Sequence, residues 1–351
     1  MSLSENKVSL NIIPKPFLYA CVFLLSLAGF MIWDQIYWWN NRDDYSFGFL
    51  VPLFALYVLF ERKSEIMGYL MRYHGKHVEN LKDNDRNFLT QAINVFFIGL
   101  FISGVLLFFL GALIRIATTP QNPASLAIAA GFSMILLSTA FIFSEETLEG
   151  SKLSIRERFS FMMLFLFPAL IWLISAPLVS VLETKVRVFL LTQVTIVVFT
   201  FMDFLGFAIE RQGNVLVLPK GVVGVEEACS GIRSLTACIF AGSFLAAVYL
   251  KQLWKKVLLV LMAMVFAVIT NLFRSAFLTL WAYFYGSEAI NDHWVLPLIG
   301  DIGSVHDVMG FAVLGLTSVG LILLLPIMNF SLSAYLNDSH SDTTKSEDSE
   351  R

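Results

Sequence analysis

The chain has 351 residues, of which 57% are hydrophobic and 15% are charged, a balance far more apolar than that of soluble domains. Its formal net charge of -3 excludes a strongly basic nucleic-acid binder, so nucleic acid is not an expected partner. The cysteines are Cys21, Cys229 and Cys238, an odd number without C-x-x-C spacing. They indicate neither a disulfide framework nor a structural zinc site, and no cofactor is expected.

Eight apolar stretches approach the roughly 20 residues that a helix needs to cross about 30 Å of hydrocarbon. They lie at about 16–34, 46–61, 91–114, 124–143, 159–182, 230–250, 257–283 and 308–328. The first resembles a signal peptide but lacks a small-residue cleavage site, so we expect it to be retained. The pattern predicts an all-α polytopic membrane protein of about eight transmembrane helices. Residues 1–330 are expected to form a single membrane domain, followed by a disordered cytoplasmic tail at 331–351.

A ninth stretch, about 188–208, is ambiguous because Asp203 interrupts it. Lys and Arg gather after spans two, four and six, whereas residues 285–305 contain neither. The positive-inside rule therefore assigns those three loops to the cytoplasm of a cell inner (plasma) membrane. A full crossing by 188–208 would move the Lys251, Lys255 and Lys256 cluster outside, so we interpret that stretch as re-entrant or interfacial. Next, 209–225 predicts a short extracytoplasmic hairpin before span six, with Gln212-Gly213-Asn214 and Pro219-Lys220-Gly221 as turns.

The polar run around Cys229 lies at the predicted outer mouth of span six. A helix N-terminus favours a thiolate over a thiol, and the thiolate is the nucleophilic form. Arg233 is one turn later, where it can hold a carboxylate or help to keep the sulfur ionised. The alternative is a buried apolar cysteine beside an interfacial arginine. Cys238 follows Cys229 by nine residues, on the opposite face of the helix and deeper in the membrane. We therefore interpret Cys238, like Cys21, as a packing residue.

Two further polar features fall in the predicted outer half of the membrane. Arg274 within span seven is costly in hydrocarbon unless it is paired or hydrated, and Asn271 on nearly the same face indicates a polar pocket. The alternative is a structural snorkelling arginine. His306 opens span eight and is a better candidate base than His293 in the middle of the loop, although a lone interfacial histidine is usually just solvated. A cysteine, a cation and a base together form a site for thiol acyl transfer.

These residues carry a resemblance to the exosortase and archaeosortase family over about 45–325. The run Glu227-Ala228-Cys229-Ser230-Gly231-Ile232-Arg233-Ser234 is similar to the family's cysteine motif. Asn271 to Arg274 resembles its arginine motif, and His306 with Gly310 its histidine motif. The resemblance implies a catalytic triad of Cys229, Arg274 and His306, supported by Glu227, Ser230, Arg233 and Asn271. Near the start, Tyr45-Ser46-Phe47-Gly48 departs from the family pattern, which commonly has histidine where this chain has Phe47.

The resemblance implies a membrane cysteine protease or transpeptidase that cuts the C-terminal sorting signals of exported proteins at the outer membrane face. Such a signal comprises a short motif such as P-E-P, one transmembrane helix and a basic cluster. The cleaved protein is then transferred to an amine or lipid acceptor or to water. Two other classes stay open, a polytopic transporter and an exopolysaccharide-assembly membrane protein. A transporter would use an intramembrane arginine and histidine in a substrate path but leaves Cys229 without a role.

Overall fold

The computed structural model describes residues 15–71, 88–144, 153–224, 232–296 and 300–329. Within these ranges, seven helices are long and apolar enough to cross a membrane, and one bent pair of helices passes the same test jointly. Two small antiparallel sheets accompany them. The predicted all-α polytopic membrane architecture is therefore confirmed. The predicted tail at 331–351 lies outside the described residues.

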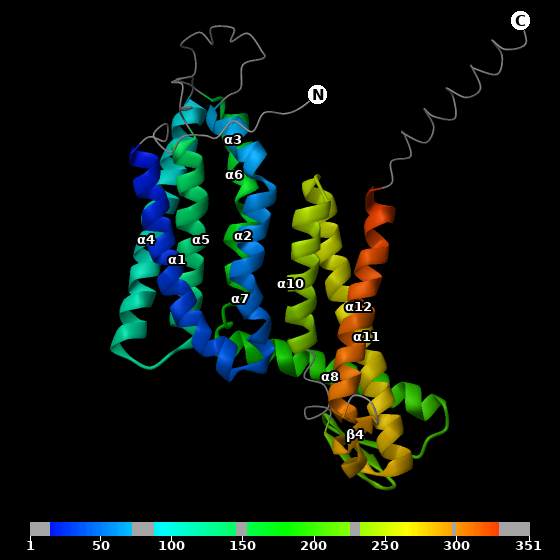
Figure 1. Ribbon diagram of the computed structural model, residues 1–351. Helices are drawn as coiled ribbons and strands as arrows, with labels where there is room; N and C mark the ends of the chain where they lie inside the picture. The colour runs from blue at the N-terminus through cyan, green and yellow to red at the C-terminus, as the bar shows by residue number, and fades with distance from the viewer. Residues whose placement is uncertain (1–14, 72–87, 145–152, 225–231, 297–299, 330–351) are drawn as a thin grey trace, which may run out of the picture.

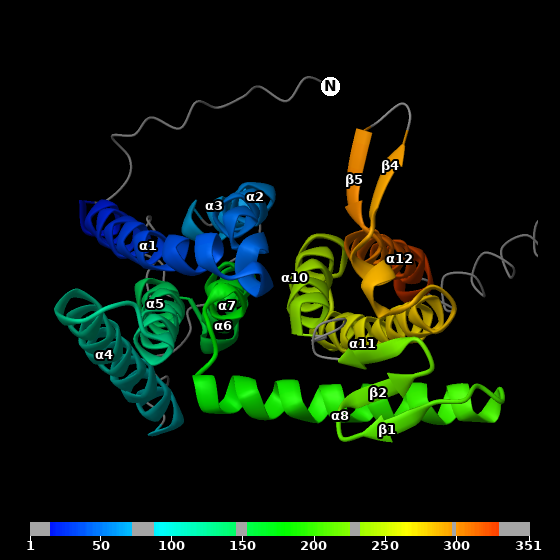
Figure 2. The ribbon, with the colours of Figure 1, turned by 90° about the horizontal axis from the view of Figure 1, so that it is seen from below.

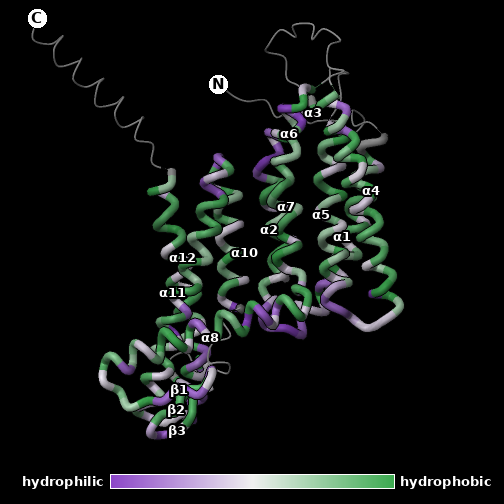
Figure 3. The backbone as a smooth tube through the Cα atoms, turned by 180° about the vertical axis from the view of Figure 1, so that it is seen from behind, coloured by the Kyte–Doolittle hydropathy of each residue, from purple (hydrophilic) through white to green (hydrophobic). Residues whose placement is uncertain are grey.

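The helices form two groups that stand side by side (Figure 1). The N-terminal group consists of α1 (Lys15–Asn41), η2 (Asp43–Leu50), α2 (Val51–Glu61), α3 (Lys63–Met71), α4 (Phe88–Ala117), α5 (Asn122–Phe143), α6 (Ile155–Leu164) and α7 (Leu166–Ser175). The C-terminal group consists of α10 (Ile232–Tyr249), α11 (Leu253–Tyr285) and α12 (Val305–Asn329). Between them in sequence, α8 (Ser180–Phe204) lies near one end of both groups, here called the α8 end. The opposite end carries α3 and is called the α3 end; hydrophilic residues gather at both ends (Figure 3).

The ambiguous ninth stretch belongs to α8, which begins at Ser180, earlier than predicted. By length and composition α8 is one of the helices that could span a membrane. However, it runs across the other helices, which are seen nearly end-on in Figure 2. Of the two interpretations of this stretch, the course of α8 fits an interfacial helix. With α8 set apart, the other long helices, the α6–α7 pair and the shorter α10 correspond to the eight predicted spans.

The fifth predicted span, 159–182, ends earlier than expected and is bent. The axes of α6 and α7 differ by 44°, and α7 ends at Ser175 because Ala176 is extended (ψ 142°) before Pro177. The bend has a cause in the sequence, since Pro168 has no N–H to donate to the carbonyl of Leu164, four residues earlier. Arg62 Nη1 donates to that carbonyl instead.

The segment for which the sequence predicts a hairpin before span six is a three-stranded meander, one strand more than a hairpin. Its strands are β1 (Glu210–Gln212), β2 (Val215–Leu218) and β3 (Gly221–Gly224), in antiparallel order. The two predicted turns connect them, and Gly213 takes the positive φ of 66° that its turn requires. After α11, where sequence patterns gave only a loop, the structure has η3 (Ser287–Asn291) and a hairpin of β4 (His293–Leu296) with β5 (Gly300–Ser304).

Aromatic side chains hold the two groups of helices together. Phe54 of α2 stacks on Phe244 of α10 with ring centroids 4.0 Å apart, and Phe47 of η2 lies 5.0 Å from Phe240. Offset and tilted aromatic pairs of this kind stabilise a contact beyond the area that they bury. They fix α10, which begins within the cysteine motif at Ile232, against the N-terminal group.

Candidate active site

Arg274 and His306 are direct neighbours, although 32 residues separate them in sequence. Arg274 Nη2 lies 3.0 Å from His306 Nε2 and donates to the His306 backbone carbonyl at 3.1 Å. Arginine can only donate, so Nε2 is the acceptor and a neutral imidazole must carry its proton on Nδ1. Nδ1 lies 3.3 Å from Asp307 Oδ1. The contacts therefore hold the ring from both sides.

A reciprocal cap fixes the position of His306 at the start of α12. Ser304 Oγ donates to Asp307 Oδ2 at 2.7 Å, the Ser304 N–H donates to the same oxygen at 3.2 Å, and the Asp307 N–H donates to Ser304 Oγ at 3.2 Å. This is a capping box with aspartate at its third position, written in the sequence as Ser304-x-x-Asp307. The capping box places His306 in the first turn of α12. From there its side chain contacts Arg274 of α11.

Unsatisfied polar atoms gather around Arg274. Asn271, only 3% exposed, has no hydrogen-bond partner for Oδ1 among the described residues. The same holds for Arg274 Nε and for Ser275 Oγ, both on the same helix. Buried polar atoms without partners are uncommon in folded proteins and cost free energy. Their clustering around one arginine supports the polar pocket that Asn271 and Arg274 predict.

Gly310, from the histidine motif, lies one turn after His306 against the arginine. A Cβ atom at this position would be 3.5 Å from Arg274 Nη2, an ordinary contact, so alanine would fit. A longer side chain would occupy the space of the guanidinium. The glycine thus gives Arg274 room beside α12.

A polar cavity of about 350 Å³ opens next to His306. It lies between β3 and η3 and is lined by Val222, Val223, Gly224, Ser287, Glu288, Ile290, Asn291 and His306. Such a volume is typical of a small ligand site. The His306 side of the site therefore borders a cavity of that size.

Cys229, Glu227 and Ser230 lie outside the described residues. Their segment connects Gly224, which lines the cavity, to α10. The structure therefore brings together Arg274, His306 and Asn271 of the predicted site. For Cys229 it gives only the chain neighbours on either side.

The residues set aside during sequence analysis lie elsewhere. His293 is on β4, exposed, with Nδ1 2.8 Å from Asp301 Oδ2. Asp301 also accepts the Gly303 N–H, and these two contacts lower the pKa of its carboxyl. Cys238 is buried in the helix bundle, as expected for a packing residue. Cys21 of α1 is half-buried.

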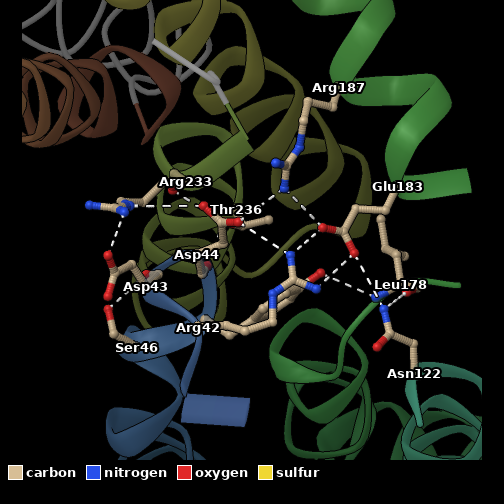
Figure 4. Close-up of polar contacts among 11 residues, drawn as sticks. Arg42, Asp43, Asp44, Ser46, Asn122, Leu178, Glu183, Arg187, Arg233 and Thr236 are labelled. Atoms are coloured by element: carbon tan, nitrogen blue, oxygen red, sulfur yellow. Dashed lines mark hydrogen bonds and ion pairs between the residues drawn. The ribbon is translucent and has the colours of Figure 1, made fainter. Parts of the chain in front are cut away.

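Arg233 binds two carboxylates of this same chain (Figure 4). Its Nη2 lies 2.8 Å from Asp43 Oδ2, and its Nε lies 3.9 Å from Asp44 Oδ1. One turn later Thr236 donates to the Asp44 carbonyl at 3.1 Å. Arg233 therefore holds carboxylates of its own chain, while its expected effect on the Cys229 sulfur concerns a residue outside those described. These contacts fix the first turn of α10 to η2.

A larger ion-pair network adjoins Arg233 and has no counterpart in the sequence analysis. Glu183 of α8 accepts two hydrogen bonds from Arg42, one of them at 3.0 Å, and a third at 3.1 Å from Arg187. Both arginines also lie 3.4 Å from Asp44. The run Arg42-Asp43-Asp44 is a local signal of charge, but Glu183, Arg187 and Arg233 lie more than 130 residues further along the chain. The network connects α8, η2 and α10 (Figure 4).

The segment that departs from the family pattern is well packed. Phe47, in place of histidine, contacts Phe240, while the buried Tyr45 accepts a hydrogen bond from the Leu178 N–H at 3.1 Å. A Cβ on Gly48 would lie 2.0 Å from the indole nitrogen of Trp39, so only glycine fits. The segment therefore has a structural role in this chain.

Among the described residues, no three His, Cys, Asp or Glu side chains lie close enough together to hold a metal ion. The arrangement instead offers a fixed cation with unused donors, a base held in one tautomer and a polar cavity. Acyl transfer needs such groups near a nucleophile.

The family model of the transmembrane exosortases matches residues 38–323. No curated protein and no solved structure matches the chain. The matched range contains the cysteine, arginine and histidine motifs together with η2 and α8. The chain therefore belongs to the transmembrane exosortase family, whose members process exported proteins that carry sorting signals.

Proposed function

We propose that this exosortase is a cysteine protease or transpeptidase with Cys229 as nucleophile, Arg274 as oxyanion donor and His306 as general base and acid. The observation that carries the proposal is the Arg274–His306 contact, 3.0 Å long, in which a half-buried arginine has a buried Nε without a partner among the described residues. A structural arginine would have its donors satisfied. An arginine that stabilises an oxyanion keeps N–H donors available, because the negative charge that they bind exists only during the reaction.

The contact also defines an order of events. His306 Nε2 is occupied by Arg274, so taking the thiol proton requires Arg274 to release it. The carbonyl oxygen of the substrate gains negative charge as the Cys229 sulfur attacks, and this oxygen is a better acceptor than a neutral imidazole. Arg274 then binds the oxyanion while His306 holds the proton. When the C–N bond breaks, His306 gives the proton to the leaving amine, and a thioester remains on Cys229.

The second half of the reaction reverses these roles. An acceptor amine, a lipid hydroxyl or water attacks the thioester, and His306 takes its proton. The C–S bond breaks, and the thiolate regains a proton. Glu227, Ser230 and Asn271 are proposed to support the site. The motif of the sorting signal, such as P-E-P, would enter the polar cavity beside His306.

We further propose a multi-pass inner-membrane location with this site on the outer face. The basic residues at the α3 end support that orientation. A membrane-impermeant thiol reagent should then label Cys229 in intact spheroplasts, while a tag after Arg351 stays protected. Labelling only after lysis would mean that the orientation is inverted.

The experiment for the reaction is to incubate membranes that contain the full chain with a tagged exported protein carrying the three-part signal. Cleavage should be lost below detection in Cys229→Ala and retained in Cys238→Ala, since Cys238 is a packing residue. Equal loss in both variants would remove Cys229 as nucleophile. Cleavage that persists in Cys229→Ala would contradict the cysteine mechanism altogether.

A further inference from the structure

A large apolar cavity lies where the two groups of helices meet, toward the α3 end. Its volume is about 610 Å³, and most of its lining comes from α7, α10 and α11. Figure 2 shows α7 and α10 facing one another. Leu170, Ile174 and Val260 are typical lining residues, and Leu170 is 40% exposed, so the cavity is open on one side. An opening between apolar helices in a membrane protein faces lipid.

Three cations line this otherwise apolar cavity, namely Arg62, Lys251 and Lys256. Lys251 precedes α11, Lys256 is in its first turn, and Arg62 joins α2 to α3, so all three belong to the α3 end. Within the part of the chain that the structure describes, no acidic side chain lines the cavity. Glu65 interacts electrostatically with Arg62 and Lys256.

Arg62 is held rigidly over the cavity. Its Nη1 donates to the Leu164 carbonyl freed by Pro168, and its Nη2 donates to the Ala247 carbonyl at 3.0 Å. These bonds use two of the five N–H donors of a guanidinium. Lys256 is close enough to Arg62 for their charges to repel each other. A cluster of like charges at the mouth of an apolar cavity is stabilised when an anion binds between them.

We propose that this cavity binds one anionic phospholipid, with the phosphate at Arg62, Lys251 and Lys256 and an acyl chain between α7 and α10. The cavity volume favours a lipid acyl chain, rather than a protein helix, as the occupant. A helix about 10 Å wide crossing about 30 Å of hydrocarbon occupies more than about 2,000 Å³, several times the cavity volume. The lipid would connect the two groups of helices at the α3 end, as the contacts of Arg233 with Asp43 and Asp44 do at the α8 end.

The test uses the full chain in nanodiscs or detergent and measures binding of phosphatidylglycerol and phosphatidylcholine with identical acyl chains by native mass spectrometry. The unmodified chain should prefer phosphatidylglycerol. The double variant Lys251→Gln/Lys256→Gln should bind it roughly thirtyfold more weakly, about fivefold for each lysine, with phosphatidylcholine binding unchanged. The matched control is Lys63→Gln, since Lys63 is exposed at the same end but does not line the cavity.

Two variants test the acyl-chain half of the site. Ser243→Phe and Leu170→Trp both fill the cavity from its lining, and Leu170 is on the open side where folding tolerates a larger residue. Either should reduce phosphatidylglycerol binding. Equal affinity for the two lipids, or an equal loss in Lys63→Gln, would overturn the proposal in favour of general surface attraction. Unchanged lipid binding with blocked cleavage in the filled variants would overturn it in favour of a substrate helix.

Discussion

Two polar clusters of this exosortase differ in how completely their charges are paired. In the first, Arg42 and Arg187 share Glu183 and Asp44, two cations facing two carboxylates. In the second, the contacts of Arg274 within the described residues are with the ring nitrogen and carbonyl of His306, and unsatisfied polar atoms lie around it. Both clusters involve arginine, yet of the two, as far as the described residues go, the first alone pairs its cations with carboxylates.

The difference separates a cluster that stabilises the fold from one that is poised for chemistry. A fully satisfied buried network makes its region rigid, whereas a partly satisfied one is costly and persists where function needs it. The first cluster should therefore govern the free energy of unfolding, and the second should govern turnover. Substitutions in each cluster test whether stability and turnover are governed separately in this way.

The largest effect is expected for Arg274→Lys. Lysine keeps the charge but loses the planar fork of donors, so directed bonds to the oxyanion are lost. Cleavage should slow about a hundredfold to a thousandfold, the usual cost of one oxyanion donor. The measurement is the cleavage rate per folded molecule, with thermal unfolding as the control for folding. Normal cleavage with lysine would show that the hydrogen-bond geometry of Arg274 is not used.

Glu183→Gln should act in the opposite way. The substitution leaves Arg42 and Arg187 with Asp44 as their shared carboxylate. Removing one partner of a buried ion pair costs about 3 kcal/mol of folding stability. The free energy of unfolding should fall by that amount while cleavage per folded molecule is retained. Glu210→Gln on the exposed strand β1 is the matched control. A loss of turnover without a loss of stability would place Glu183 in the reaction and remove the contrast between the clusters.

The smallest effect is expected for Arg233→Gln. The Arg233 and Asp43 side chains are 57% and 80% exposed, and such surface pairs contribute less than about 1 kcal/mol. Cleavage should therefore change by less than about fivefold. A much larger loss with unchanged stability would mean that Arg233 acts on Cys229 or on the substrate, in addition to holding η2.

Hydropathy predicted the spans because each helix must be apolar along its whole length, a local property that any window of sequence shows. The same reasoning extended span five to 182, because the apolar run continues while Pro168 and Pro177 interrupt the helix. It also left α8 ambiguous. A helix of that length and composition can cross the membrane or lie along its surface. Its contacts with residues distant in sequence determine which of the two it does.

The candidate site was predicted in part for the same reason. Arg274 and His306 stand out locally, one as a charge in an apolar helix and the other at a helix start marked by Ser304 and Asp307. The pair of Glu183 with Arg42 gave no such signal, since the two residues are 141 apart along the chain, and only the pair with Arg187, four residues later, is local. Short strands such as β4 were not predicted, because four residues followed by a proline are too few to show the alternation of apolar and polar side chains that marks a strand.

The central claim is that Cys229 shares one site with the Arg274–His306 pair. Its most direct test needs no substrate and follows the alkylation rate of Cys229 against pH in a Cys21→Ser/Cys238→Ser background. A thiolate stabilised by the Arg274 guanidinium should react with a midpoint well below the ordinary thiol pKa of about 8.5. In Arg274→Gln the midpoint should rise toward that value, while His293→Gln, which changes the exposed histidine paired with Asp301, should leave it unchanged. Identical midpoints in both variants would contradict a shared site.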